Sequence, residues 1–256
     1  MIVVTQYGKG KPILLIHGSA ANYTTWNVQL VGLRREFTLM AYDRAGNDSA
    51  GNDAGDSGNV YSVEMHADDA AEIIGSEIAT SCTVVGSSFG AIVALDLARR
   101  YPKLVNSLVL CEPPLAQSDT LAPVPDGFAC RFDSIVRQEG GPAAAEFFLR
   151  CVLGDASFEA MPKTFQKRSM EEWWQIRSDM TALARYRIEY SRLRDEINCP
   201  VTLVGGEKSA SFYREVLETL QLAIPGSELA ILRGAGHMMQ VDAHKQFNDI
   251  LRRIVP

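Results

Sequence analysis

Short apolar runs rich in branched aliphatic residues recur along the chain. They lack the polar alternation of a half-exposed strand, which is typical of strands that are buried on both faces of a sheet. Six strands are predicted on this basis: 13–17, 37–42, 82–86, 108–111, 201–204 and 229–232. We expect them to form the centre of a sheet with helices packed on each side.

Segments with apolar residues at helical spacing separate these runs. Ser62 is a suitable N-cap for the first of them, and Pro102 closes the second. The helices predicted on this basis cover 62–78, 89–101, 212–223 and 241–254. Alternation of strands and helices predicts an α/β fold with a mostly parallel, doubly wound sheet.

The middle of the chain breaks this alternation. Between about 115 and 195 there is no convincing buried strand, but three helical stretches are predicted. They cover 126–139, which stops at a Gly-Gly pair, 143–153, which follows a proline, and 165–190. We therefore expect an inserted all-helical cap at 115–195 and a core domain made of 1–114 and 196–256. A surface loop is expected at 47–59.

Length and charge limit the function classes. The 256 residues suit one large domain with an insertion. Lys and Arg number 25 against 31 Asp and Glu, giving a net charge of −6 without a basic block, so nucleic acid is not an expected partner. No apolar run reaches the roughly 20 residues that span a membrane, and the start does not resemble a signal peptide. We therefore expect a cytoplasmic protein without a membrane partner.

Neither a metal nor an organic cofactor is expected. The histidines and cysteines have no metal-ligand spacing, and no phosphate-binding glycine pattern follows a strand. The five cysteines are scattered and are expected to be reduced thiols in or near the core. They are Cys82, Cys111, Cys130, Cys151 and Cys199.

The segment 86–90, Gly-Ser-Ser-Phe-Gly, carries the clearest chemical signal. It matches Gly-x-Ser-x-Gly and lies between a predicted buried strand and a predicted helix, the context that a nucleophile on a tight turn requires. Only Ser88 has glycines two residues before and two residues after it. Ser88 is therefore the predicted nucleophile, exposed above the sheet at the N-terminus of the helix.

A serine hydroxyl needs a base, which is usually a histidine held by a carboxylate. His237 is the candidate, because it lies in a glycine-rich loop after the last predicted strand, at the same sheet edge as Ser88. His17 is a poorer candidate, since it ends an early strand. His66 and His244 fall inside predicted helices, where we expect surface positions.

These motifs together resemble the α/β-hydrolase superfamily over nearly the whole chain. Four segments carry the resemblance. They are His-Gly-Ser at 17–19, Asp-Arg-Ala-Gly at 43–46, the tight turn that carries the nucleophile Ser88 (the nucleophile elbow), and Gly-His at 236–237. The resemblance implies that the helical insertion is the cap of that superfamily. It also implies an oxyanion hole made by the backbone N–H groups of Ser19 and Phe89, and the Ser19 hydroxyl either adds a donor or has only a turn role.

The catalytic acid departs from the usual pattern of the superfamily. Ser209 stands where most members carry an Asp, after the strand at 201–204. Some members take the acid from the end of the preceding strand, where Glu112 lies, and Pro113 restricts its backbone. Glu112 is the predicted acid, and Glu207 is the alternative.

The insertion is the expected source of substrate contacts. Trp173, Trp174 and Met170 are predicted to line an apolar pocket for a small molecule. The resulting hypothesis is a serine hydrolase acting on an ester or lactone. Two alternatives stay open: hydrolysis of a carbon–carbon or other acyl bond by the same residues, and a catalytically decayed protein that binds a small ligand. A homodimer is compatible with the sequence.

Overall fold

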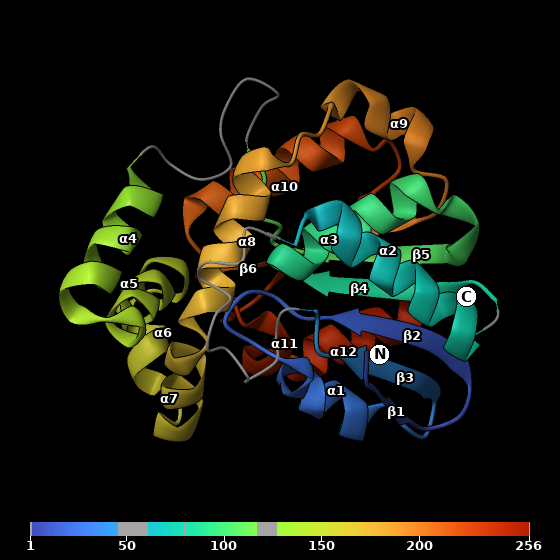
Figure 1. The fold of residues 1–256 in the computed structure, drawn as a ribbon. Helices are drawn as coiled ribbons and strands as arrows, with labels where there is room; N and C mark the ends of the chain where they lie inside the picture. Colours follow the sequence, from blue (N-terminus) through green and yellow to red (C-terminus); the bar gives the residue numbers. More distant parts are fainter. Residues whose placement is uncertain (1, 46–60, 79, 117–126, 256) are drawn as a thin grey trace.

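The computed structural model describes residues 2–45, 61–78, 80–116 and 127–255 (Figure 1). One sheet in the order β1-β3-β2-β4-β5-β6-β7 forms its centre. The strands are β1 (Val4–Tyr7), β2 (Lys11–Ile16), β3 (Phe37–Tyr42), β4 (Cys82–Ser87), β5 (Val105–Cys111), β6 (Val201–Gly206) and β7 (Glu228–Leu232). Only β1 is antiparallel to its neighbour, so the predicted mostly parallel α/β sheet is confirmed.

Both faces of the central strands are buried, as their unbroken apolar pattern predicts. Along β2, Leu14 belongs to one hydrophobic cluster, whereas Ile13 and Leu15 belong to another. Val84 and Val85 divide in the same way along β4. Successive side chains of a strand point to opposite faces, so each cluster fills one side of the sheet. Burying each such side chain stabilises the fold by about 1.5–3 kcal/mol.

Helices form a layer on each face (Figure 1). The first cluster includes residues of α2 (Val63–Ile73), α3 (Phe89–Arg100), α9 (Leu193–Glu196) and α10 (Ser211–Ala223). The second includes residues of α1 (Asn27–Gly32), α11 (Met239–Asp242) and α12 (His244–Ile254). The short helical turns are η1 (Tyr23–Trp26), η2 (Ile74–Ile78), η3 (Pro102–Leu104) and η4 (Tyr190–Arg192). The sheet is therefore doubly wound.

Several predicted boundaries need correction. The apolar pattern does not predict strand β1, because β1 is a four-residue edge strand that is only half-buried. The helix predicted at 62–78 continues beyond Ile73 as a π-helical turn, and the one predicted at 241–254 is split at Ala243. These breaks leave the apolar spacing intact, so the spacing alone does not reveal them.

In the described part of the chain between β5 and β6, five helices precede η4 and α9 (Figure 1). They are α4 (Phe128–Glu139), α5 (Gly141–Leu153), α6 (Asp155–Ala160), α7 (Lys163–Glu171) and α8 (Trp173–Arg185). They share a third hydrophobic cluster, around Phe132, Leu149 and Ile176, which also includes Ala20 of the loop after β2. The single helix predicted at 165–190 is wrong, because the chain turns at Glu172 between α7 and α8.

Other expectations about the insertion and the loops stay predictions. The domain limits at 115–195 depend in part on residues 117–126, which lie outside the described residues. The loop expected at 47–59 also lies outside them, as does the first residue of the helix predicted at 126–139. Within the described ranges, no helix is both long and apolar enough to cross a membrane.

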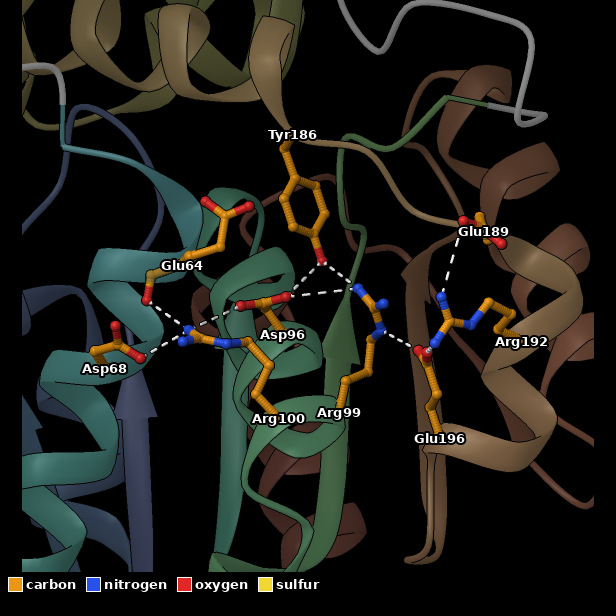
Figure 2. Close-up of polar contacts among 9 residues, drawn as sticks. All are labelled: Glu64, Asp68, Asp96, Arg99, Arg100, Tyr186, Glu189, Arg192 and Glu196. Atoms are coloured by element: carbon orange, nitrogen blue, oxygen red, sulfur yellow. Dashed lines mark hydrogen bonds and ion pairs between the residues drawn. The ribbon is translucent and has the colours of Figure 1, made fainter.

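A polar network joins α3 to the chain that leaves α8 (Figure 2). Tyr186, directly after α8, donates its hydroxyl hydrogen to Asp96 at 3.1 Å and accepts a hydrogen bond from Arg99 at 3.1 Å. Arg99 also pairs with Glu196 of α9 at 2.5 Å, and Arg100 pairs with Asp68 of α2 at 2.7 Å. Burial raises the pKa of Asp96. The network fixes the end of the insertion against the core.

Candidate active site

Ser88 occupies a strained turn between β4 and α3. Its backbone has φ 54° and ψ −122°, a conformation that costs a non-glycine residue about 1–3 kcal/mol. Its N–H donates to the carbonyl of Cys111 at 2.8 Å. A Cβ atom at Gly86 would lie 2.2 Å from the Gly90 carbonyl oxygen, and one at Gly90 would lie 2.3 Å from the Ile16 carbonyl oxygen. Only glycine fits at both places, which explains the spacing of the motif.

Glu112 and His237 form a buried hydrogen-bonded pair at the same sheet edge. The distance between His237 Nδ1 and Glu112 Oε2 is 2.6 Å, and the side chains are 4% and 1% exposed. The other carboxylate oxygen, Oε1, accepts a hydrogen bond from the Gly206 N–H at 2.7 Å. Because β5, β6 and β7 are parallel neighbours, their carboxyl ends bring these three residues together.

The geometry leaves one nitrogen of His237 available. Nε2 is buried and has no hydrogen-bond partner among the described residues. When the ring carries a single proton on Nδ1, which donates to the carboxylate, Nε2 is the nitrogen without a proton. Such a nitrogen can accept a proton from a nucleophile.

The backbone of Glu112 is also constrained. Its φ is 43°, which is uncommon for a residue with a side chain. Its N–H donates to the Val204 carbonyl of β6 at 3.2 Å. The carboxylate is thus oriented by its own strand end and by the neighbouring strand.

Neither residue near the usual address of the acid contacts His237 by a hydrogen bond. Glu207 is exposed, and its Oε2 accepts from the Gly234 N–H at 2.7 Å. The Ser209 hydroxyl is buried without a hydrogen-bond partner within the described ranges. Of the two candidate glutamates, Glu112 is the one that lies against His237.

Tyr213 is a residue that sequence reasoning missed. It lies in the first turns of α10, and its ring stacks on the His237 imidazole with centroids 4.4 Å apart and planes 22° apart. Burial, together with the nearby Glu112, raises the pKa of Tyr213. In the sequence Tyr213 is indistinguishable from any apolar helix position, so no local pattern predicts this contact.

The loop at 17–21 runs beside Ser88. A Cβ atom at Gly18 would lie only 2.9 Å from the Ser88 Cβ atom, so the backbone passes close to the nucleophile. The Ser19 hydroxyl donates to Asp179 Oδ2 at 2.7 Å, and its role is therefore a contact with α8. Phe89 is the first residue of α3, where a backbone N–H has no acceptor within the helix.

Arg44 is a second residue whose role the sequence did not reveal. It is 1% exposed and binds Asp179 through both terminal nitrogens, at 3.0 and 2.7 Å. Its guanidinium also lies 4.4 Å from the centre of the Phe89 ring and donates to the Gly18 carbonyl at 3.3 Å. This arginine therefore links the turn after β3 to the loop at 17–21 and to α8.

Two buried histidines border Arg44. The expected surface position of His66 is wrong, because it is 3% exposed and its Nε2 accepts from Arg44 at 3.1 Å. His17 Nε2 accepts the backbone N–H of Arg44 at 3.1 Å, so its Nδ1 carries the proton that bonds the Gly18 carbonyl. Burial, and then the charge of Arg44, hold the pKa of both rings well below the usual value. Both are neutral structural groups.

The predicted substrate contacts lie within the insertion. Trp173 packs against Gly141, where an added Cβ atom would lie 2.3 Å from the indole ring. Trp173 and Met170 both pack on the hydrophobic cluster of the insertion, and Trp174 is half-buried. Contact of these three residues with a substrate stays a prediction.

The described residues hold no cluster of three or more potential metal ligands. All five cysteines are free, and the expected core position is wrong for Cys130 and Cys151, which are exposed. Cys82 and Cys111 are buried, and desolvation raises the pKa of both thiols. These buried thiols are inert packing groups.

Comparison with known proteins identifies a matching family and similar solved structures. Residues 13–250 match the family described as "Alpha/beta hydrolase family". An uncharacterized protein of Mycobacterium tuberculosis is 27% identical over 272 residues, which cover 97% of this chain and 76% of that protein.

Two solved structures are similar over almost the whole chain. An esterase from Thermogutta terrifontis has a TM-score of 0.80 and 22% identity, covering 100% of this chain and 94% of its own. An enol-lactonase from Burkholderia xenovorans LB400 has a TM-score of 0.75 and 18% identity, covering 99% and 95%. Because both sequences are less than 25% identical to this chain, the similarity of the two structures shows only that the fold is shared.

Proposed function

The chain belongs to the alpha/beta hydrolase family and is a hydrolytic enzyme, and we propose that it cleaves a carboxylic ester or lactone of a small apolar molecule. The observation that carries the proposal is the buried Glu112–His237 pair, whose free Nε2 lies at the sheet edge that also presents Ser88. In this proposal Ser88 is the nucleophile, His237 the base and Glu112 the orienting acid.

The proposed reaction has two halves. Ser88 Oγ bonds to the carbonyl carbon while its proton passes to His237 Nε2, and the carbonyl oxygen becomes an oxyanion. The intermediate then expels the alcohol oxygen, which takes the proton from Nε2 and leaves an acyl-enzyme. Water attacks the acyl carbon, gives a proton to Nε2, and releases the carboxylic acid as Ser88 recovers its hydrogen.

Each supporting residue has a separate task. The Glu112 carboxylate keeps the proton of the neutral His237 ring on Nδ1. It also stabilises the imidazolium that forms in each half of the reaction. The backbone N–H groups of Ser19 and Phe89 are the proposed donors to the oxyanion, and each such donor contributes about 3 kcal/mol in other hydrolases. No step calls for a cofactor.

Fewer observations support the proposed substrate class than support the proposed catalytic residues. The two similar structures described above are named an esterase and an enol-lactonase. The aromatic and methionine side chains of the insertion favour an apolar acyl or alcohol group. We further propose a cytoplasmic location, whereas a homodimer stays a prediction from the sequence.

The first test is covalent labelling of Ser88. Wild-type protein treated with a fluorophosphonate is expected to gain the mass of one adduct, and Ser88→Ala is expected to gain none. Intact-mass spectrometry measures both. A wild-type protein that gains no adduct and hydrolyses no ester or lactone would contradict the proposal and favour a ligand-binding protein.

A pair of glutamine variants tests the acid. Glu112→Gln is expected to lower kcat on an ester by about 10⁴-fold, because the amide no longer holds the productive tautomer of His237. Glu207→Gln is the matched control and is expected to retain activity. The reverse result would assign the acid to Glu207. Turnover of carbon–carbon substrates, but not of esters, would favour the alternative hydrolase.

A further inference from the structure

Helix α8 of the insertion contacts the loop at 18–21 at three consecutive residues. The Ser19 hydroxyl donates to Asp179 at 2.7 Å, and the Ala21 N–H donates to Gln175 Oε1 at 3.3 Å. Ala20 between them belongs to the same hydrophobic cluster as Ile176 of α8. Asp179 and Gln175 are one helical turn apart, so they lie on the same face of α8.

The backbone of this loop is strained. Ala20 has φ 53°, an unfavourable conformation for a residue with a side chain, and it is buried. Such a conformation persists only where surrounding contacts impose it. The contacts with α8 supply that constraint.

The buried ion pair between Arg44 and Asp179 lies where the loop at 17–21 meets helix α8. Asp179 is 4% exposed; its Oδ1 accepts one bond from Arg44, and its Oδ2 accepts bonds from both Arg44 and Ser19. Arg44 in turn donates to the Gly18 carbonyl. The peptide between Gly18 and Ser19 is therefore held at its carbonyl by Arg44 and by His17 Nδ1, which lies 2.8 Å from the same oxygen, and the Ser19 side chain is held by Asp179.

This peptide also carries the N–H that the proposed function assigns to the oxyanion hole. The N–H of Ser19 and the carbonyl of Gly18 belong to the same planar peptide group, so fixing the carbonyl fixes the direction of the N–H. Gly18 lies directly against Ser88, as the 2.9 Å approach of an added Cβ atom shows. A rotation of the peptide would therefore move the N–H donor relative to the nucleophile.

We propose that Asp179 is a positioning residue, through which helix α8 of the insertion sets the Ser19 N–H in the oxyanion hole. This inference rests on the proposed function. According to this inference, the hydrolytic site is complete only when α8 is packed against Arg44 and the loop at 17–21. Asp179 is about ninety residues from Ser88 in the chain, and its effect on catalysis passes through Arg44 and Ser19.

The inference predicts a specific kinetic signature. A donor to the oxyanion acts mainly in the transition state, so its displacement lowers kcat and leaves KM nearly unchanged. Loss of one such donor lowers kcat by about 10²–10³-fold in other hydrolases. Asp179→Asn is therefore expected to lower kcat on an ester by about 10²-fold, with KM within about threefold of the wild-type value.

The affinity of a transition-state analogue gives an independent readout. A trifluoromethyl ketone adds reversibly to Ser88 and places an oxyanion in the hole. Its affinity is expected to fall by the same factor as kcat/KM in Asp179→Asn, while affinity for the uncharged alcohol product is retained. A double-mutant cycle with Ser19→Ala is expected to be non-additive, because both changes release the same peptide.

Two further variants separate positioning from stability. Arg44→Met combined with Asp179→Leu replaces the pair with apolar groups, which in other proteins preserves the fold. We expect this double variant to have a Tm near that of the wild type and still a low kcat. Asp133→Asn is the matched control: it removes the 2.5 Å ion pair that Arg177 of α8 makes away from the loop, and kcat should not change.

The outcomes distinguish the two proposals. An active wild type together with an unchanged kcat in Asp179→Asn, or full activity in the apolar double variant, would overturn the positioning role alone. A rise in KM at constant kcat would also overturn it, because it would assign α8 to substrate binding. A wild type that neither labels nor hydrolyses esters would overturn the proposed function and, with it, this inference.

Discussion

At the scale of single residues, the site divides into groups that a local pattern predicts and groups that it does not. Ser88 and His237 are predicted by glycine spacing next to a strand, and Glu112 by its place at a strand end before two prolines. Arg44 and Asp179 are 135 residues apart, so their contact depends on tertiary structure that no local pattern contains. Tyr213 escapes prediction for the same reason.

The stack of the Tyr213 ring on His237 predicts that Tyr213 contributes to catalysis. Tyr213→Leu is expected to lower kcat by up to about tenfold, because an aromatic stack contributes about 0.5–1.5 kcal/mol to the orientation of the ring. Tyr213→Phe should keep the kcat of the wild type, since the contact is made by the ring. Steady-state kinetics with a Tm for each variant measures this. A phenylalanine variant as slow as the leucine variant would contradict the stacking role.

At the scale of elements, the apolar spacing predicts the strands better than the helix ends. All six predicted strands are present in the sheet, since burial on both faces imposes a continuous apolar run. The helix predicted at 165–190 fails because apolar residues continue at helical spacing through the turn at Glu172. A break that leaves the buried face intact is invisible in that spacing.

The strand–turn–helix unit around Ser88 gives a prediction about backbone packing. Gly86→Ala is expected to give insoluble or unfolded protein, because its Cβ atom would lie 2.2 Å from backbone that cannot move aside. Gly75→Ala is the matched control, since nothing lies within 4 Å of its added Cβ atom. We expect this control to be as stable as the wild type or about 0.5–1 kcal/mol more stable. Thermal unfolding distinguishes the two variants, and equal stability would contradict the packing argument.

At the scale of the whole molecule, the stability of the fold depends on pH, and the carboxyl group of Glu172 contributes to this dependence. Glu172 lies at the turn between α7 and α8, and its Oε2 is buried without a hydrogen-bond partner in the described part of the chain. Burial raises the pKa of Glu172 from 4.5 to about 7, with the charge of Asp43 adding to the rise and Arg168 opposing it. The folded protein therefore binds this proton more tightly than the unfolded chain does.

The sign of the pH effect follows from this difference. The contribution of Glu172 to stability is complete below pH 4.5 and is lost as the pH rises through about 7. Glu172→Gln keeps a neutral group, so it is expected to raise the Tm at pH 8 by a few degrees and to change it little at pH 4.5. Differential scanning calorimetry at the two pH values tests this.

The neighbouring glutamate is the control for that measurement. Glu171 is exposed, and Glu171→Gln removes the same charge from the same turn without a buried carboxyl group. Its Tm should differ little from wild type at either pH. An equal gain in Tm at both pH values for Glu172→Gln would assign the effect to packing and not to the proton.

The long connection between the adjacent strands β5 and β6 has a consequence for how the enzyme folds. Leu108 pairs with Val201, so these adjacent strands are joined through ~90 residues, and closing a flexible loop of that length costs about 4 kcal/mol of chain entropy. The bonds that orient Glu112 come from Val204 and Gly206 of β6. During refolding, helix signals should therefore recover first, and hydrolytic activity should return only with this late strand pairing.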